Sequence, residues 1–174
     1  MGITEDIAGS NIILITTSKS KYNESLGVIQ PELEKAGGMV GYITINKPYN
    51  SILQDFGKKG INKNKFFFVD AITSTVQSPQ PSPNCIFVSS PTALTDLGLA
   101  FSSLFSEKKC DAVFFDAIST LGVYQDPGSV IKFVHNLITK ARVLNKKAIF
   151  LALKEDSETL IKDLNMFVDR IIEL

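Results

Sequence analysis

The sequence contains little of the chemistry on which many enzymes depend. It has one histidine, His135, and two cysteines, Cys85 and Cys110. No second histidine and no Gly-x-Ser-x-Gly motif accompanies His135, so nothing here supports nucleophilic catalysis. We interpret His135 as a surface side chain, because it lies outside the apolar stripe of the segment FVHNLI. The cysteines lack Cys-x-x-Cys spacing and flank apolar runs, and we expect them to be reduced core residues.

An excess of charge is also missing. Lys+Arg and Asp+Glu number 18 each, which argues against a general attraction to nucleic acid or to an anionic membrane. No apolar stretch approaches the roughly 20 residues that span a bilayer. The first ten residues, MGITEDIAGS, are acidic and do not resemble a signal peptide. We therefore expect a cytoplasmic protein.

What the chain does have is a regular series of short apolar runs. With 174 residues and 44% hydrophobic residues, it is expected to form a single domain, 1–174, with a full core. Continuously apolar runs of this length are typical of strands buried on both faces. The predicted strands are 11–16, 40–45, 66–70, 85–88, 112–115, 148–153 and 170–174.

Helical patterns separate these runs. We predict helix starts at Asn23, at Ser90-Pro91, at Ser129 and at Ser157, and a short helix over 51–56. Gly37-Gly38 is expected to end the first helix, and Pro31 to kink it or delay its start. Alternation of strands and helices predicts an α/β fold of three layers, with an open, mostly parallel sheet of about seven strands. Ligands bind beyond the carboxyl ends of such strands, which here lead into loops 17–22, 46–50, 70–76, 116–124 and 154–157.

The segments YITINKP, FFFVDAIT, CIFVSSPTALTDL, VFFDAISTL, VIKFVHNLI and DRIIEL together resemble the KaiC-like branch of the RecA superfamily ATPases. The resemblance covers almost the whole chain and is closest to archaeal members that lack a Walker A motif. It places the strand that ends in Asp116 where the family has its Walker B aspartate, which helps to hold Mg²⁺. It implies a RecA-like core that assembles into rings or filaments with ATP between subunits.

Two other parts of the family's ATPase site are absent. A Walker A loop reads Gly-x-x-x-x-Gly-Lys-[Ser/Thr], whereas the loop after the first strand, TTSKSKYNES, has no glycine. Non-glycine residues lose roughly 1–2 kcal/mol each in left-handed backbone, so a phosphate-binding nest is not expected. Asn46-Lys47 stands where the family has glutamates that activate water, and a protonated lysine is no general base.

The leading hypothesis is a domain that has lost ATP hydrolysis and acts as a regulatory or assembly module. Its partner would be a second copy or an active paralogue, and no cofactor is expected. The alternative is an atypical nucleotide-binding protein or ATPase in which Lys19, Lys21, Ser25 and Asp116 bind ATP-Mg²⁺. A nucleic-acid-binding accessory is a third, weaker hypothesis, which the neutral net charge opposes.

Other arrangements of the same residues are possible. Asp116 alone, or Asp70 and Asp116 together, could hold a metal ion. Asp116, Ser119 and Lys154 loosely follow the order of a phosphoacceptor receiver domain, but the first strand ends in Thr16-Thr17 and not in the metal-binding acids of such a domain. The ordinary interpretation is that Asp116 binds the backbone of the loop 117–124 that follows it.

Overall fold

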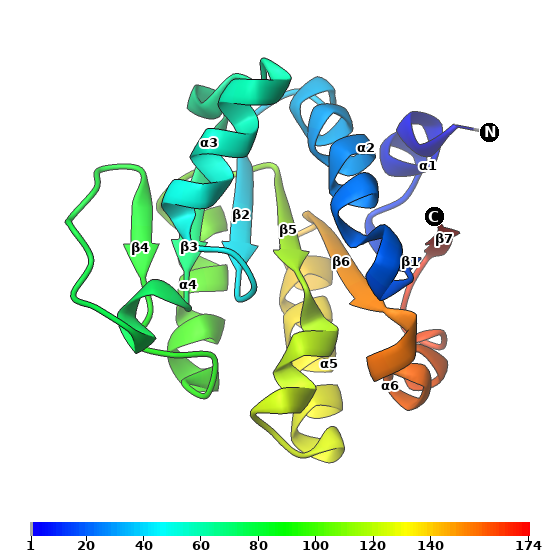
Figure 1. Cartoon of the computed structure of the whole chain (residues 1–174). Coiled ribbons are helices and arrows are strands. Elements are labelled where there is room, and N and C mark those ends of the chain that lie inside the picture. The colour runs from blue at the N-terminus through cyan, green and yellow to red at the C-terminus, as the bar shows by residue number, and fades with distance from the viewer. Residues whose placement is uncertain (1) are drawn as a thin grey trace.

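The computed structural model describes residues 2–174 and contains a sheet of seven parallel strands. Figure 1 shows this sheet between two layers of helices. The strand order is β4-β3-β2-β5-β6-β1-β7. The strands are β1 (Ile12–Thr17), β2 (Val40–Thr44), β3 (Phe66–Asp70), β4 (Cys85–Phe87), β5 (Ala112–Asp116), β6 (Lys147–Leu153) and β7 (Arg170–Glu173). The predicted fold class and strand number are confirmed.

Six α-helices lie in the described residues, three on each face of the sheet. They are α1 (Ile3–Gly9), α2 (Tyr22–Lys35), α3 (Tyr49–Lys59), α4 (Leu94–Ser106), α5 (Pro127–Val143) and α6 (Glu158–Leu164). Side chains of α1, α2 and α3 form one core with the sheet, and those of α4, α5 and α6 form the other. Short 3-10 turns connect them: η1 (Lys19–Lys21), η2 (Lys63–Lys65), η3 (Thr73–Thr75), η4 (Ile118–Val123) and η5 (Lys154–Asp156).

Several predicted helix starts are wrong. Helix α4 begins at Leu94 and not at Ser90-Pro91, because the Ser90 carbonyl accepts from the Ala93 amide and closes a turn first. Helix α5 is capped by Asp126, whose carboxylate accepts from the Ser129 amide at 3.0 Å. Pro127 therefore occupies the first helical position, where a missing N–H has no cost.

The first long helix also differs from the prediction. Helix α2 follows directly from η1, so it begins at Tyr22 without an Asn23 cap. The later start expected from Pro31 is wrong, because the helix begins at Tyr22 and continues through Pro31 to Lys35. It ends before Gly37 and Gly38, as predicted. Gly37 and Gly38 have positive φ angles of 80° and 73°, which glycine adopts without steric cost.

Helix α1 has no counterpart in the sequence prediction. Its last turn is held by Lys147, whose ammonium donates to the carbonyls of Ile7 and Ser10. A cation at a helix C-terminus stabilises the unpaired carbonyls and the helix dipole.

None of the described helices is both long and apolar enough to cross a membrane. Cys85 and Cys110 are buried free thiols, as expected.

Candidate functional site

The candidate site lies between the carboxyl ends of β2 and β5. The chain leaves β2 toward β3 and leaves β5 toward β6, which are on opposite sides in the strand order. A crevice between strands whose connections diverge in this way is the usual ligand position in open α/β sheets. Thr44 and Asp116 are paired in register at this point, and Asn46 is the second residue after β2. The sequence prediction of loops 46–50 and 116–124 therefore falls on the correct edge.

Asp116 is completely buried and its carboxylate is surrounded by hydrogen-bond donors. The Tyr22 hydroxyl from α2 lies 2.8 Å from Oδ1 and 2.9 Å from Oδ2. The Tyr42 hydroxyl from β2 donates to Oδ2 at 3.0 Å, and the Asn46 amide donates to Oδ1 at 3.3 Å. The prediction that Asp116 binds loop 117–124 is wrong. Its side chain points to the face covered by α2 and α3, since it alternates with Phe115, which belongs to the opposite core.

The network continues away from Asp116 along α2 and α3. Gln30 donates to the Tyr42 hydroxyl at 3.0 Å and accepts from the Lys59 ammonium at 2.8 Å. Tyr42 is completely buried, so within residues 2–174 the only hydrogen-bond partners of its hydroxyl are Gln30 and Asp116. The hydrogen bonds therefore form a continuous chain from the Lys59 ammonium at the surface to the Asp116 carboxylate in the interior.

Burial raises the pKa of Asp116 to about 6, although the donors from Tyr22, Tyr42 and Asn46 favour the ionised form. Burial, together with the charge of Asp116, raises the pKa of Tyr22 and of Tyr42 above the ordinary value for tyrosine. Both phenols consequently stay protonated at neutral pH, and each has its proton available for the carboxylate.

A raised pKa in the folded state makes stability depend on pH. Because the folded protein holds the Asp116 proton more tightly than the unfolded chain, the ionised carboxylate destabilises the fold above pH 6, and this penalty disappears as the pH falls toward the unfolded value of 3.8. We expect the free energy of unfolding to rise by roughly 1.4 kcal/mol between pH 8 and pH 5 from this group alone. Urea unfolding of the wild type and of Asp116→Asn at several pH values measures it. Parallel pH profiles for the two proteins would contradict the assignment.

The residues proposed for nucleotide binding are brought to the same end of the sheet but do not form one cluster. The Lys19 ammonium forms an ion pair with Asp156 at 2.6 Å, and its backbone N–H lies 2.9 and 3.2 Å from the Glu155 carboxylate oxygens. Lys21 is exposed. Ser25 is buried, and its hydroxyl contacts that of Thr17 at 2.7 Å.

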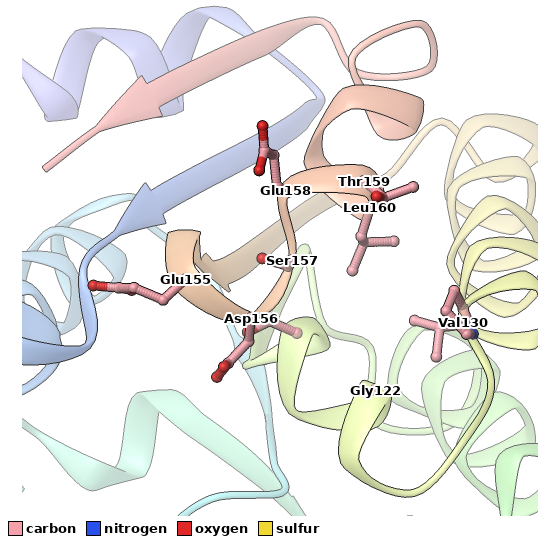
Figure 2. A pocket seen from close by; sticks show the side chains of 10 residues that line it. Gly122, Val130, Glu155, Asp156, Ser157, Glu158, Thr159 and Leu160 are labelled. Carbon is pink, nitrogen blue, oxygen red and sulfur yellow. The ribbon is translucent and has the colours of Figure 1, made fainter.

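The two carboxylates that contact Lys19 come from η5, after β6, which is the strand next to β1. In Figure 2 the Glu155 side chain extends away from Val130 and toward the blue segment that follows β1. The ion pair with Asp156 also raises the pKa of Lys19. The loop after β1 therefore has an anionic partner within the chain itself.

A cavity of about 260 Å³ lies beside these residues, between η4 and the start of α6. Figure 2 shows Val130 and Leu160 on its apolar side, and Glu158 on its rim. The two serines in its wall form hydrogen bonds with the backbone of Leu153. Ser119 accepts from the Leu153 amide at 2.9 Å, and Ser157 donates to the Leu153 carbonyl. The other polar groups in its wall are Thr159 and the carboxylates of Glu155, Asp156 and Glu158, so the cavity is acidic and unsuited to an anionic ligand.

The other predicted constellations are separated. Asp70 accepts from the backbone amides of Tyr49, Ile72 and Thr73. Thr44 of β2 lies between Asp70 and Asp116 in the sheet, so the two carboxylates do not share a site. Lys154 pairs with Glu173 at 3.1 Å and not with Asp116. Among residues 2–174 no group of three or more His, Cys, Asp or Glu side chains is arranged to hold a metal ion.

Asn46 and Lys47, which stand in the position of the family's general base, have structural contacts. Asn46 donates to Asp116, and the Lys47 ammonium donates to Asn23 at 2.8 Å and to Asp55 at 3.2 Å. Lys47 thereby connects the end of β2 with α2 and α3.

Tyr22, Tyr42, Glu155 and Asp156 are site residues that the sequence prediction missed. One signal was available for Tyr42: a tyrosine inside a buried strand needs a partner for its hydroxyl. Nothing local indicates that Tyr22 or Glu155 contacts the site, because each comes from another part of the chain.

Comparison with known proteins gives a result for the fold and none for the activity. No protein-family model matches the chain, and neither does any curated protein. Among solved structures it is similar to a KaiC-like protein of the hyperthermophilic archaeon Pyrococcus horikoshii OT3, with a TM-score of 0.67 and 11% sequence identity. The match covers 94% of this chain and 70% of the other. The chain therefore shares the α/β fold of this KaiC-like protein.

Proposed function

We propose that this protein is a RecA-like domain that does not hydrolyse ATP and acts by binding another protein, as a regulatory or assembly module. The observation that carries the proposal is the pair of contacts from Glu155 and Asp156 to Lys19. In a nucleotide site, the amide and the lysine after the first strand would face phosphate oxygens. Here they face carboxylates of the same chain, and an incoming triphosphate would meet two negative charges.

The Asp116 site supports the same proposal. A Mg²⁺ ion needs oxygen ligands with free lone pairs and retains several of its waters. Both oxygens of Asp116 contact hydroxyl or amide donors, and the side chain is inaccessible to solvent. The residues present therefore do not fit an ATP-Mg²⁺ site.

The partner would be a second copy or an active relative, and the buried thiols suit the reducing cytoplasm.

Thermal unfolding with and without ATP-Mg²⁺ tests the proposal. We expect no shift in melting temperature at millimolar nucleotide for the wild type, and the same for Lys19→Ala. A ligand present at about 100 times its dissociation constant would add about 2.7 kcal/mol, which is easily detected. A shift of this size, or an ATPase rate that disappears in Asp116→Ala, would overturn the proposal.

The alternative is nucleotide binding by Lys19, Lys21, Ser25 and Asp116 after the loop rearranges. The exposed position of Lys21 at the carboxyl edge of the sheet is what favours it. It requires ATP-dependent stabilisation that is lost in Lys21→Ala, so the same experiment separates the two functions.

A further inference from the structure

One face of the sheet is only partly covered at its β4 edge, where Ile86 is half-buried and Val88 is buried. Helix α4 packs on β2, on β5 and on α5, and the helix layer ends there. In Figure 1, β4 forms the free edge of the sheet at the left, with α4 behind β3. A groove of about 560 Å³ remains between α4 and β4, and Ile86 and Val88 contribute apolar side chains to it.

The wall of this groove opposite β4 is a stripe that runs along α4 and ends at Glu107, the residue after the helix. Its residues are spaced by three and four positions, so they lie along one side of the helix. Ala100 is buried at the border with the core that Leu97 and Phe101 join, whereas Leu99 faces away from that core. The stripe consists of Asp96, Leu99, Ala100, Ser103 and Glu107. Leu99 is 63% exposed, although it lies at the centre of the stripe. The Ser103 hydroxyl is buried and, among the described residues, has no hydrogen-bond partner.

The dimensions of the stripe match another helix. Asp96 and Glu107 are eleven positions apart, which corresponds to roughly 16 Å along a helix axis. Between them Ala100 and Ser103 are small, and small side chains allow a second helix to approach closely. The edge of β4 fits strand addition less well, because the strand has three residues and prolines follow and precede it closely, at Pro91 and Pro83.

The charges indicate what kind of helix would fit. Within residues 2–174 neither Asp96 nor Glu107 forms an ion pair. The nearby Lys108 ammonium lies 4.8 Å from the ring centre of Phe67, over β3. Acidic groups at both ends of an apolar groove are complementary to basic groups on the partner, and they oppose pairing of this face with the same face of a second copy.

We propose that the groove between α4 and β4 binds an amphipathic helix of a partner protein. The helix presents an apolar face to Leu99, Ala100 and Ile86, with basic residues near Asp96 and Glu107. This surface gives the proposed interaction module its contact face, and in that sense it rests on the proposed function.

A labelled helical peptide of about 18 residues tests the surface by fluorescence anisotropy. Its apolar face carries leucine and alanine at helical spacing, and two lysines stand eleven positions apart to face Asp96 and Glu107. We expect saturable binding that Leu99→Glu weakens at least about tenfold, since it places an unpaired carboxylate in the groove. Val143→Glu, a change at an 80% exposed position outside the groove, is the matched control and should leave binding unchanged.

Exchange of the charges adds a second requirement. The double variant Asp96→Lys/Glu107→Lys should lose affinity for the lysine peptide and gain affinity for a peptide with glutamate at the two positions. Two results would contradict the proposal that this groove binds a helix. One is the absence of binding to the wild type at about 1 mM peptide, and the other is equal binding to Leu99→Glu and Val143→Glu. If the peptide does not bind and ATP does not shift the melting temperature, the groove proposal is wrong but the proposed function is not contradicted. If ATP binds, the proposed function is contradicted, with or without peptide binding.

Discussion

Replacement of Asp70 by alanine is expected to destabilise the protein by about 3–5 kcal/mol. The Asp70 carboxylate is completely buried at the end of β3. It accepts from the Tyr49 amide at 2.7 Å, from the Ile72 amide at 2.8 Å, and from the amide and hydroxyl of Thr73 at 2.9 and 2.5 Å. Alanine leaves these donors without an acceptor in the interior, including an amide of the first turn of α3.

Urea unfolding measures this loss, with two milder variants as controls. Asp70→Asn keeps one acceptor oxygen and should lose about 1–2 kcal/mol, and Thr73→Val removes one hydroxyl contact and should lose about 1 kcal/mol. The three losses should therefore fall in that order. If Asp70→Ala does not fold, the order of the two milder variants still tests the role of the carboxylate. A loss below about 1 kcal/mol for alanine would show that Asp70 does not hold the start of α3.

Tyr42→Phe is the second substitution with a large expected effect, about 2 kcal/mol of stability. It removes one hydroxyl that serves two buried partners, the Gln30 amide and the Asp116 carboxylate. Loss of a donor to the ionised carboxylate should also raise the pKa of Asp116 further. The pH range over which the protein gains stability should therefore move upward from that of the wild type.

Tyr22→Phe is the matched control for this prediction. Tyr22 is only partly buried, and Asn46 still donates to the same carboxylate, so a loss of about 1 kcal/mol is expected. In an Asp116→Asn background, Tyr42→Phe should cost less than in the wild type, because the two groups interact directly. Equal losses for the two tyrosine variants, or independent effects of Tyr42 and Asp116, would contradict the described network.

Asp70 and Asp116 show how far strand patterns alone can lead. Both end an apolar strand, both are completely buried, and their sequence contexts, FFFVD and VFFD, are nearly the same. One binds backbone amides of the adjoining loops, as a strand-end aspartate commonly does. The other is held by side chains of α2 and β2 and by Asn46, the second residue after β2. The sequence predicted the first role for Asp116, where the structure has the second.

The sequence by itself determined the α/β class, the approximate strands and the edge of the sheet at which polar loops gather. These properties follow from local periodicity and from the burial of continuous apolar runs, which each segment carries independently. Helix starts were less predictable, because Ser90 and Ser129 form turn and cap hydrogen bonds that compete with the predicted cap positions.

Only the tertiary structure decided what the site residues contact. Tyr22 and Asp116 are 94 positions apart, and Lys19 and Glu155 are 136 apart. Such pairs meet because β6 lies between β5 and β1, and because α2 crosses the same face of the sheet to which Asp116 points. Strand order and the face of each side chain are properties of the whole sheet, so no local pattern specifies them.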